Sequence, residues 1–152
     1  MAEATTTAPR RPPAFMNKLI GVVLRSPLHG LVSKDLLLLT FTGRKSGASI
    51  TTPVTYTRSG ERLLVFTGSP WWKNLRGGAP VTLRLRGRVV RATAEVSEDS
   101  ATVLAETRAY LARKGVSNAR MIGLSLDSTR EPTDAELRAA INGRVAIYIT
   151  TE

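Results

Sequence analysis

Residues 42–47, Thr-Gly-Arg-Lys-Ser-Gly, place two cations and a hydroxyl between two glycines. Glycine permits backbone angles that turn several N–H groups toward one side, so a tight turn of this composition can form a concave site for an anion. Arg44 and Lys45 would add full positive charges, and Ser46 would add a hydroxyl donor. A solvated hairpin turn, whose charges only keep the loop wet, is the alternative interpretation of the same residues.

A second stretch that could bind a ligand is residues 68–78, Gly-Ser-Pro-Trp-Trp-Lys-Asn-Leu-Arg-Gly-Gly, which contains both tryptophans of the chain. Two adjacent indoles usually cannot both point into a core, so we expect one of them to be partly exposed. An exposed indole beside Lys73 and Arg76 suits stacking against a planar anionic ligand. A hydrophobic clamp that closes one end of a barrel is the alternative.

The net charge of +10 is concentrated in one part of the chain. Residues 1–94 contain 15 Lys and Arg against three acids, a net charge of +12, whereas the remainder contains seven bases and nine acids. A positive field on one part favours a polyanionic partner: a nucleic acid, an anionic membrane surface, or a ligand rich in phosphate or carboxylate. An arginine-rich composition would not explain why the acids gather in the second part.

The residue types that are missing exclude several kinds of enzyme. The chain has no cysteine, so it has no disulfide, no cysteine nucleophile and no cysteine-ligated metal. Its single histidine, His29, cannot form a multi-histidine metal site, and no nucleophile motif lies near it. We expect neither a metal site nor a hydrolytic triad. The absence of cysteine fits the cytoplasm, which is the expected location, and no stretch is long and apolar enough to span a bilayer.

The elements that must position the two stretches are mainly β-strands. Apolar or alternating runs predict strands at 36–41, 50–57, 63–67, 80–86 and 90–96, and a final strand at 145–150. Ser59 and Gly60 predict the turn of a hairpin between the second and third of these. Five strands in succession favour a small antiparallel barrel over a doubly wound sheet.

The N-terminal part carries a tail and a helix. Residues 1–13 are rich in Ala, Thr and Pro and predict a disordered tail, which leaves 14–152 as a single domain. Residues 14–25 have helical spacing of apolar positions, with Lys18 and Arg25 at the margins. Such a helix either covers one end of a β core or lies on a membrane surface, and the second interpretation would make the protein membrane-associated.

Two further helices are expected in the second part. Glu98 and Asp99 predict a helix start, and that helix ends at Gly115 with Leu104, Arg108 and Leu111 on one side. Thr133 and Glu136 form a capping box for a short helix that ends at Gly143. Residues 116–130 have no clear pattern.

The chain contains, in this order, the leucine strand, residues 42–47, a strand with Pro53, a hairpin, and the Trp-Trp-Lys-Asn-Leu segment. The order of these motifs resembles that of the deazaflavin-dependent nitroreductase family. Members of that family are oxidoreductases that use coenzyme F-420, and the similarity covers residues 36–96. It implies an α+β fold: a split β-barrel of about six mainly antiparallel strands with peripheral helices, related to the flavin-binding barrels of pyridoxamine-phosphate oxidases. The family's cofactor has a phosphodiester and an oligoglutamate tail, in agreement with the charge asymmetry.

The resemblance also implies which residues bind the cofactor. Arg44, Lys45 and Ser46 would hold the phosphate or tail. Pro53 and Val54 would lie along the deazaflavin, and Thr67, Gly68 and Ser69 would meet its ring edge through backbone groups. Trp71, Trp72 and Asn74 would shape the pocket on the other side.

Three positions qualify this assignment. Ile50 stands where some relatives carry a basic residue, and Thr55 stands where some nitroreducing members have tyrosine, so nitroimidazole reduction is not expected. Tyr56 is the nearest candidate proton donor, although a strand tyrosine more often serves packing. No catalytic residue is assigned.

The function that the resemblance implies is hydride transfer between reduced coenzyme F-420 and an electrophilic small molecule, such as a quinone, an enone or a nitro compound. Three alternatives stay open: a deazaflavin-binding protein without turnover, a relative that uses flavin mononucleotide, and a basic barrel that binds nucleic acid. The last would use Arg84, Arg86, Arg88 and Arg91, but no aromatic residue interleaves them, which disfavours it. A monomer and a homodimer are both compatible with the sequence.

Overall fold

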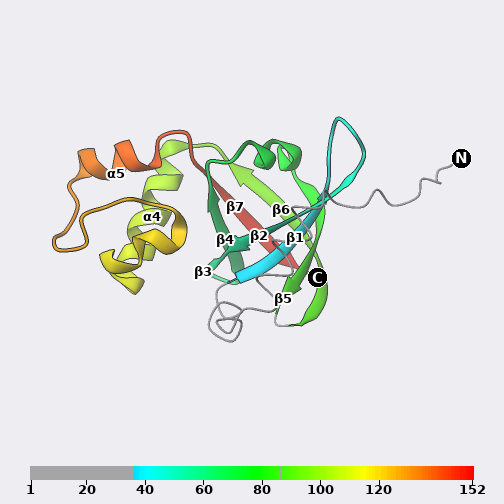
Figure 1. Cartoon of the computed structure of the whole chain (residues 1–152), viewed down its shortest axis with the longest axis horizontal. Coiled ribbons are helices and arrows are strands. Elements are labelled where there is room, and N and C mark those ends of the chain that lie inside the picture. The colour runs from blue at the N-terminus through cyan, green and yellow to red at the C-terminus, as the bar shows by residue number, and fades with distance from the viewer. Residues whose placement is uncertain (1–35, 86) are drawn as a thin grey trace, which may run out of the picture.

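A single antiparallel sheet of seven strands organises the protein, and the computed structural model describes residues 36–85 and 87–152 (Figure 1). The strand order is β2-β1-β5-β6-β7-β4-β3, and the sheet curls into a half-barrel. The predicted α+β split barrel is therefore confirmed, with seven strands in place of about six. The strands are β1 (Leu36–Thr42), β2 (Ser49–Thr55), β3 (Thr57–Ser59), β4 (Arg62–Thr67), β5 (Ala79–Leu85), β6 (Arg88–Ser97) and β7 (Val145–Thr151).

The strand predicted at 50–57 is wrong in one respect, because the chain leaves the ladder at Tyr56. β2 pairs with β1, whereas β3 pairs with β4 in the hairpin that turns at Gly60, which has a φ of +63°. The interruption lets one β-rich run serve two distant places in the sheet. The helix predicted at 14–25, its membrane contact and the tail at 1–13 lie outside the described residues.

The interior of the curled sheet is filled by side chains that alternate along the strands. Leu39 of β1 and Leu83 of β5 face each other across the ladder, and both are fully buried. Successive residues of a strand point to opposite faces, so the alternation predicted for 80–86 and 90–96 places one set inward. Val81, Ala92 and Ala94 are buried with Leu83 in this way, which confirms those two strands.

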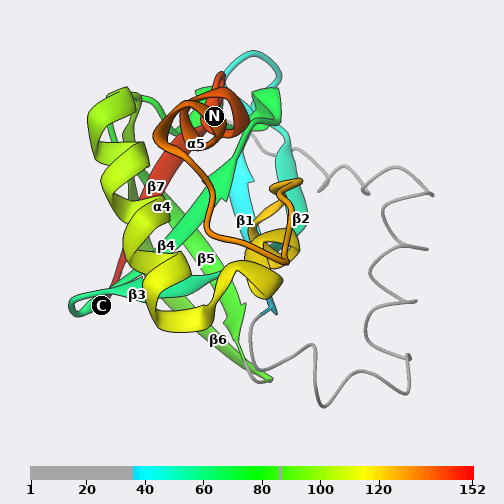
Figure 2. The same ribbon diagram turned by 90° about the vertical axis from the view of Figure 1, so that its left-hand side faces the viewer.

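Helices cover the outer face of β4 and β7 (Figure 2). These are α4 (Ser100–Lys114), the 3-10 helix η2 (Val116–Ile122) and α5 (Asp134–Ile141). The N-cap at Asp99 and the end of α4 at Gly115 agree with the sequence, and Leu104 and Leu111 of the expected side pack in the cluster under the helix, but Arg108 does not. Val103, Thr107 and Tyr110 are buried with Leu111, whereas Arg108 is exposed and pairs with Asp134.

The capping box of α5 is present. The Glu136 N–H donates to Thr133 Oγ1 over 3.2 Å, and the Thr133 N–H donates back to Glu136 Oε1 over 2.9 Å. Arg130 Nη2 donates to the same carboxylate over 2.6 Å. This bond from Arg130, followed by the bond from the Thr133 backbone, lowers the pKa of Glu136 to about 2.

Because the folded pKa of Glu136 is below its ordinary value of 4.5, ionised Glu136 stabilises the fold above pH 4.5, and this contribution is lost as the pH falls toward 2. We expect the melting temperatures of the wild type and Glu136→Gln to converge over that interval. Glu131→Gln, which changes an exposed acid of the same loop, is the control. Melting curves recorded across the interval measure the effect, and a constant difference between wild type and Glu136→Gln would contradict it.

Candidate functional site

The basic turn at residues 43–48 joins β1 to β2. The Gly43 N–H donates to the Ala48 carbonyl over 2.7 Å, and the Gly47 N–H donates to the Gly43 carbonyl over 2.8 Å. Gly47 has a φ of +70°, which glycine adopts without strain. Ser46 Oγ accepts the Ala48 N–H over 3.1 Å. Several backbone donors of the turn are thus used within the protein, so an anion here would be held mainly by side chains.

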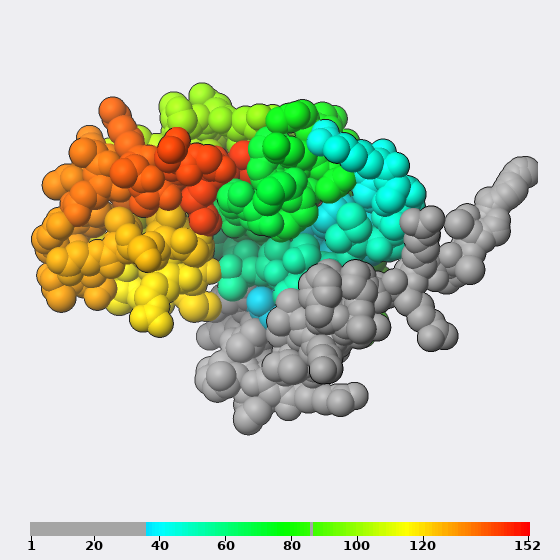
Figure 3. Space-filling model, turned by 45° about the horizontal axis from the view of Figure 1, so that its top comes forward, coloured from blue at the N-terminus to red at the C-terminus, as the bar shows by residue number. Residues whose placement is uncertain are grey.

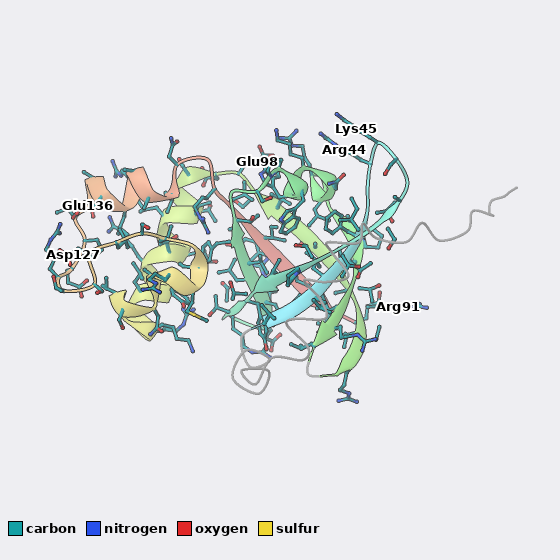
Figure 4. All side chains as sticks on the ribbon, viewed as in Figure 1. Arg44, Lys45, Arg91, Glu98, Asp127 and Glu136 are labelled. Carbon is teal, nitrogen blue, oxygen red and sulfur yellow. The ribbon has the colours of Figure 1, made fainter. Side chains whose placement is uncertain are left out.

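Arg44 and Lys45 are the side chains available for that purpose. Both are exposed, and Figure 4 shows them projecting from the tip of the turn, on the side of the barrel where η1 (Pro70–Leu75) lies. No ion pair within the described part of the chain neutralises either one. Two uncompensated cations on a short, hydrogen-bonded turn can meet an anionic ligand without first breaking an internal pair.

Asn74 joins the basic turn to the tryptophan segment. Its Oδ1 accepts the Arg44 N–H over 2.9 Å, and its Nδ2 donates to the Trp71 carbonyl over 2.8 Å. One amide side chain therefore holds together the two stretches that the sequence singles out, through residues that lie 30 positions apart. Asn74 is better described as the support of the site than as a wall of the pocket.

Replacing Asn74 with alanine removes both bonds. We expect a loss of about 1–2 kcal/mol in the free energy of unfolding, because neutral hydrogen bonds contribute about 0.5–1.5 kcal/mol each and part of this site is solvated. Urea denaturation measures the loss, and faster hydrogen exchange at the Arg44 amide would locate it. Unchanged exchange at that amide would show that Asn74 does not fix the turn. Asn118→Ala, on η2, serves as the comparison for a generic asparagine substitution.

The two tryptophans have different environments, as the sequence predicts. Trp72 is buried at 7% exposure, and the Arg76 guanidinium lies 4.9 Å from the centroid of its ring. Arg76 itself pairs with Glu98 over 3.0 Å. Trp71 is only half-buried and stacks on Phe41, with 5.4 Å between ring centroids and 26° between planes. Trp72 is thus a core residue, whereas Trp71 presents an indole at the surface.

An open cavity of about 530 Å³ lies beside Trp71. Its walls come from the end of β2, the end of β4, η1 and η2, and in Figure 3 the surface of β2 and β4 is visible between the green η1 segment and the yellow η2 segment. The volume is within the range of small-molecule sites, about 300–1,000 Å³. Six of the eleven predicted cofactor-binding residues line it: Pro53, Val54, Thr67, Gly68, Ser69 and Trp71.

The other predicted residues lie outside this lining. Arg44, Lys45, Ser46 and Asn74 belong to the adjoining turn and to η1, and Trp72 lines a neighbouring cavity of about 580 Å³. Within the cavity the Ser69 N–H already donates to Thr67 Oγ1 over 3.0 Å. That N–H is therefore not open to a ring edge.

Tyr56, the candidate proton donor, lines another cavity of about 230 Å³ with Tyr110 and Asn118. Its ring also packs against the sheet interior. The packing interpretation of Tyr56 is therefore the better supported one.

Sequence reasoning missed the part of the cavity wall that comes from the second half of the chain. Arg120, Met121 and Ile122 line it from η2, Gly123 lines it from the C-cap of η2, and Arg144 lines it from the turn before β7. Thr55 Oγ1 donates to the Met121 carbonyl over 2.6 Å, which ties η2 to β2. The 3-10 helix has no 3.6-residue period to detect. The dipeptide Gly143-Arg144 before an apolar strand was the one available signal.

The arginines at 84, 88 and 91 lie on β5 and β6, exposed and outside the cavity lining; Figure 4 labels Arg91 there. Within residues 36–85 and 87–152 no three acids or histidines gather into a group that could hold a metal ion. None of the helices described in that range is long and apolar enough to cross a membrane.

A curled antiparallel half-barrel with an open cavity and a basic turn defines a split-barrel protein. Residues 22–120, well over half of the chain, match the family described as F420H(2)-dependent quinone reductase. The chain belongs to this family, which confirms the resemblance to the deazaflavin-dependent oxidoreductases. No curated protein sequence matches the chain.

Solved structures with a similar fold share little sequence with the chain. The FAD and heme binding protein from Mycobacterium smegmatis is 20% identical, with a TM-score of 0.45 over 84% of this chain and 65% of that one. A putative pyridoxamine 5'-phosphate oxidase from Listeria innocua is 12% identical, with a TM-score of 0.46 over 91% and 94%. A structure described as an F420-H2 dependent reductase is 18% identical, with a TM-score of 0.45 over 78% and 95%.

Proposed function

We propose that this protein is a reductase that transfers a hydride from reduced coenzyme F-420 to a quinone. The observation that carries the proposal is the convergence of six predicted residues on one cavity, beside a turn with two uncompensated cations, in a chain that belongs to a quinone reductase family of that cofactor. Enones and nitro compounds are further acceptors that the same site would admit.

The residues present fit such a cofactor. Pro53 and Val54 offer apolar surface from β2, and Trp71 offers an indole whose plane is held by Phe41. A planar ring can lie against surfaces of this kind with little loss of conformational entropy. The cavity is open, so a ligand seated in it can extend beyond its mouth, and Asn74 holds the basic turn against the segment that carries Trp71.

Each part of the site would have a separate task. Arg44 and Lys45 would bind the phosphate or carboxylate end through charge-assisted hydrogen bonds, which are about twice as strong as neutral ones. The apolar wall at Pro53 and Val54 would exclude water from the reacting face. When bound, reduced coenzyme F-420 supplies the hydride. The quinone would take this hydride and one proton from solvent and would leave as the hydroquinone.

The test is steady oxidation of reduced coenzyme F-420 by the purified full-length protein with quinone, enone and nitro acceptors. We expect turnover with quinones that depends on the protein concentration. Binding without turnover for any acceptor would instead indicate a deazaflavin-binding protein. A flavin released from the purified protein and identified by mass spectrometry would indicate the flavin mononucleotide relative. Absence of cofactor binding at micromolar concentration would refute the proposal.

A further inference from the structure

Arg144 is a half-buried cation in the wall of the proposed site that the assignments above do not use. It lies in the turn between α5 and β7, where its N–H donates to the Ile141 carbonyl over 2.9 Å. Its side chain borders both the cavity of about 530 Å³ and the neighbouring cavity of about 580 Å³. Arg144 therefore stands between the two hollows.

Two glycines make room for this side chain. A Cβ on Gly123 would lie 3.1 Å from Arg144 Nη1 and 3.2 Å from Nη2, closer than most real contacts, and Gly123 has a φ of +80°. A Cβ on Gly68 would lie 3.5 Å from Arg144 Cγ. The side chain thus passes between the end of β4 and the end of η2, and a larger residue at 123 would require the guanidinium to shift.

The guanidinium of Arg144 holds η2 in place. Nη2 donates to the Ile122 carbonyl, and Nη1 makes a longer contact of 3.5 Å with the Gly123 carbonyl. Carbonyls at the end of a helical segment lack intrahelical partners, so a cation there stabilises the segment. Arg144 and the Thr55 bond to Met121 together fasten η2 over the cavity.

The charge of Arg144 is not neutralised. No carboxylate of the described residues pairs with it, and no acid lines the cavity, whereas Arg120 lines it with a second cation. Burial lowers the pKa of Arg144 from its ordinary value of 12.5, which shows that the surroundings oppose the charge without offering a counter-ion. A guanidinium has five N–H donors, and the carbonyls at 122 and 123 use two of them.

We propose that Arg144 is the specificity-determining residue for the electron acceptor, and that it selects quinones bearing an anionic substituent such as a sulfonate or carboxylate. That the ligand is an electron acceptor rests on the proposed function, whereas its negative charge is inferred from the geometry around Arg144. The basic turn at Arg44 and Lys45 would serve the anionic end of the cofactor, so the cations of the cavity wall are left for the second ligand. Of these, Arg120 is exposed and Arg144 is half-buried and fixed by two carbonyls. The two carbonyl bonds hold the guanidinium at the cavity wall, and no other hydrogen bond among the described residues uses its remaining donors, which would serve the ligand.

The first experiment measures binding without relying on turnover. The full-length protein is titrated with naphthoquinone sulfonate and with the uncharged naphthoquinone, and quenching of the tryptophan fluorescence is followed with and without coenzyme F-420. Because hydrogen bonds to charged groups contribute more than neutral ones, we expect Arg144→Met to weaken sulfonate binding by about 10-fold or more and to change binding of the uncharged quinone less than about 3-fold.

Arg138→Met is the matched control. Arg138 is an exposed arginine of α5 that lines the neighbouring cavity and not the cavity beside Trp71. Its replacement removes the same charge from the same region, so it should leave both affinities within about 2-fold of wild type. An equal loss of sulfonate binding in both variants would reduce the effect to general electrostatics and would overturn the proposal.

Arg144→Lys separates the charge from the support of η2. Lysine keeps the positive charge but cannot span two carbonyls as a fork. We expect it to retain most of the preference for the sulfonate while the amides of Gly123 and Leu124 exchange faster with solvent. If faster exchange in Arg144→Met is accompanied by equal losses for both quinones, Arg144 only supports η2 and the proposal is wrong.

Cofactor binding, measured alongside, distinguishes failure of this inference from failure of the proposed function. Failure of the wild type to bind coenzyme F-420, with sulfonate binding that still depends on Arg144, would refute the proposed function and the acceptor role but leave the anion site at Arg144 standing. Normal cofactor binding and turnover, with no preference for the charged quinone, would support the proposed function and refute the role of Arg144. A large rise in the Kd of the cofactor in Arg144→Met, with the acceptor preference unchanged, would assign the charge to the cofactor and also overturn the inference.

Discussion

Replacing Arg44 and Lys45 together with alanine is expected to weaken the binding of coenzyme F-420 by about 100-fold or more. Each cation would make charge-assisted hydrogen bonds to the anionic end of the cofactor, and such bonds contribute about 1.5–3 kcal/mol each. Folding should be nearly unaffected, because both side chains are exposed and no ion pair of the described residues involves them. Fluorescence titration of the cofactor at fixed ionic strength measures the affinity, and urea denaturation checks the fold.

The control removes an equal charge elsewhere. Arg84 and Arg88 are exposed on β5 and β6 and do not line the cavity. Their joint replacement with alanine should change the affinity less than about 3-fold. An affinity unaltered by the loss of Arg44 and Lys45 would show that residues 42–47 form only a solvated turn. Equal losses in the two double variants would show that net charge, and not the turn, attracts the cofactor.

Replacing Trp72 with alanine is expected to lower the free energy of unfolding by about 3–5 kcal/mol, as for other large aromatic residues truncated in a core. Trp72 is 7% exposed and packs with the fully buried Leu75 and other residues of the sheet interior, and the Arg76 guanidinium would lose the ring beneath it. Many domains are stable by only about 5–15 kcal/mol, so this variant would be near the limit of folding. Trp72→Phe, which keeps part of the volume, provides a folded comparison.

Trp71→Ala should affect cofactor binding more and stability less than Trp72→Ala. It removes a half-buried indole and the stack on Phe41, an aromatic pair worth about 0.5–1.5 kcal/mol beyond its buried area. The loss of stability should therefore be smaller than for Trp72, while the loss of a cavity wall should weaken cofactor binding by about 10-fold. Denaturation and titration of both variants give the comparison. A greater stability loss for Trp71 than for Trp72 would contradict the roles assigned to them.

The sequence alone predicts those elements whose local pattern of residues agrees with their place in the fold. The alternation of Val81 and Leu83 defines an inner face because β5 is buried on one side only. The capping box of Thr133 and Glu136 satisfies its own helix end and needs no tertiary partner. Such signals are complete within a few residues, so they can be recognised without the rest of the molecule.

The remainder depends on tertiary packing. β2 and β3 are one β-rich run, and only their partners, β1 and β4, show that Tyr56 interrupts it. The helix face centred on Leu104 and Arg108 fits helical spacing as well as the face that is buried, and contact with β4 and β7 decides between them. The charge asymmetry predicts an anionic partner but not its position, because the cations divide between the turn at Arg44 and the β5–β6 ribbon.

Some residues of the candidate site could be predicted from the sequence, and others are brought to it only by tertiary packing. The contiguous stretch at 68–78 pointed to Gly68 and Trp71, and the family resemblance pointed to Pro53; the fold brings the three residues to one cavity. Arg144 lies 73 residues after Trp71 in the sequence. Its contribution depends on two glycines that lie close to it only in the folded chain. Long-range contributions of this kind leave no local pattern.

A crystal structure of the full-length protein with coenzyme F-420 tests the central claim most directly. The account predicts the deazaflavin in the cavity bordered by Pro53, Val54 and Trp71, with its phosphate and glutamate end at Arg44 and Lys45. A cofactor that occupies the neighbouring cavity beside Trp72, or whose anionic end lies along Arg84 and Arg88, would contradict it.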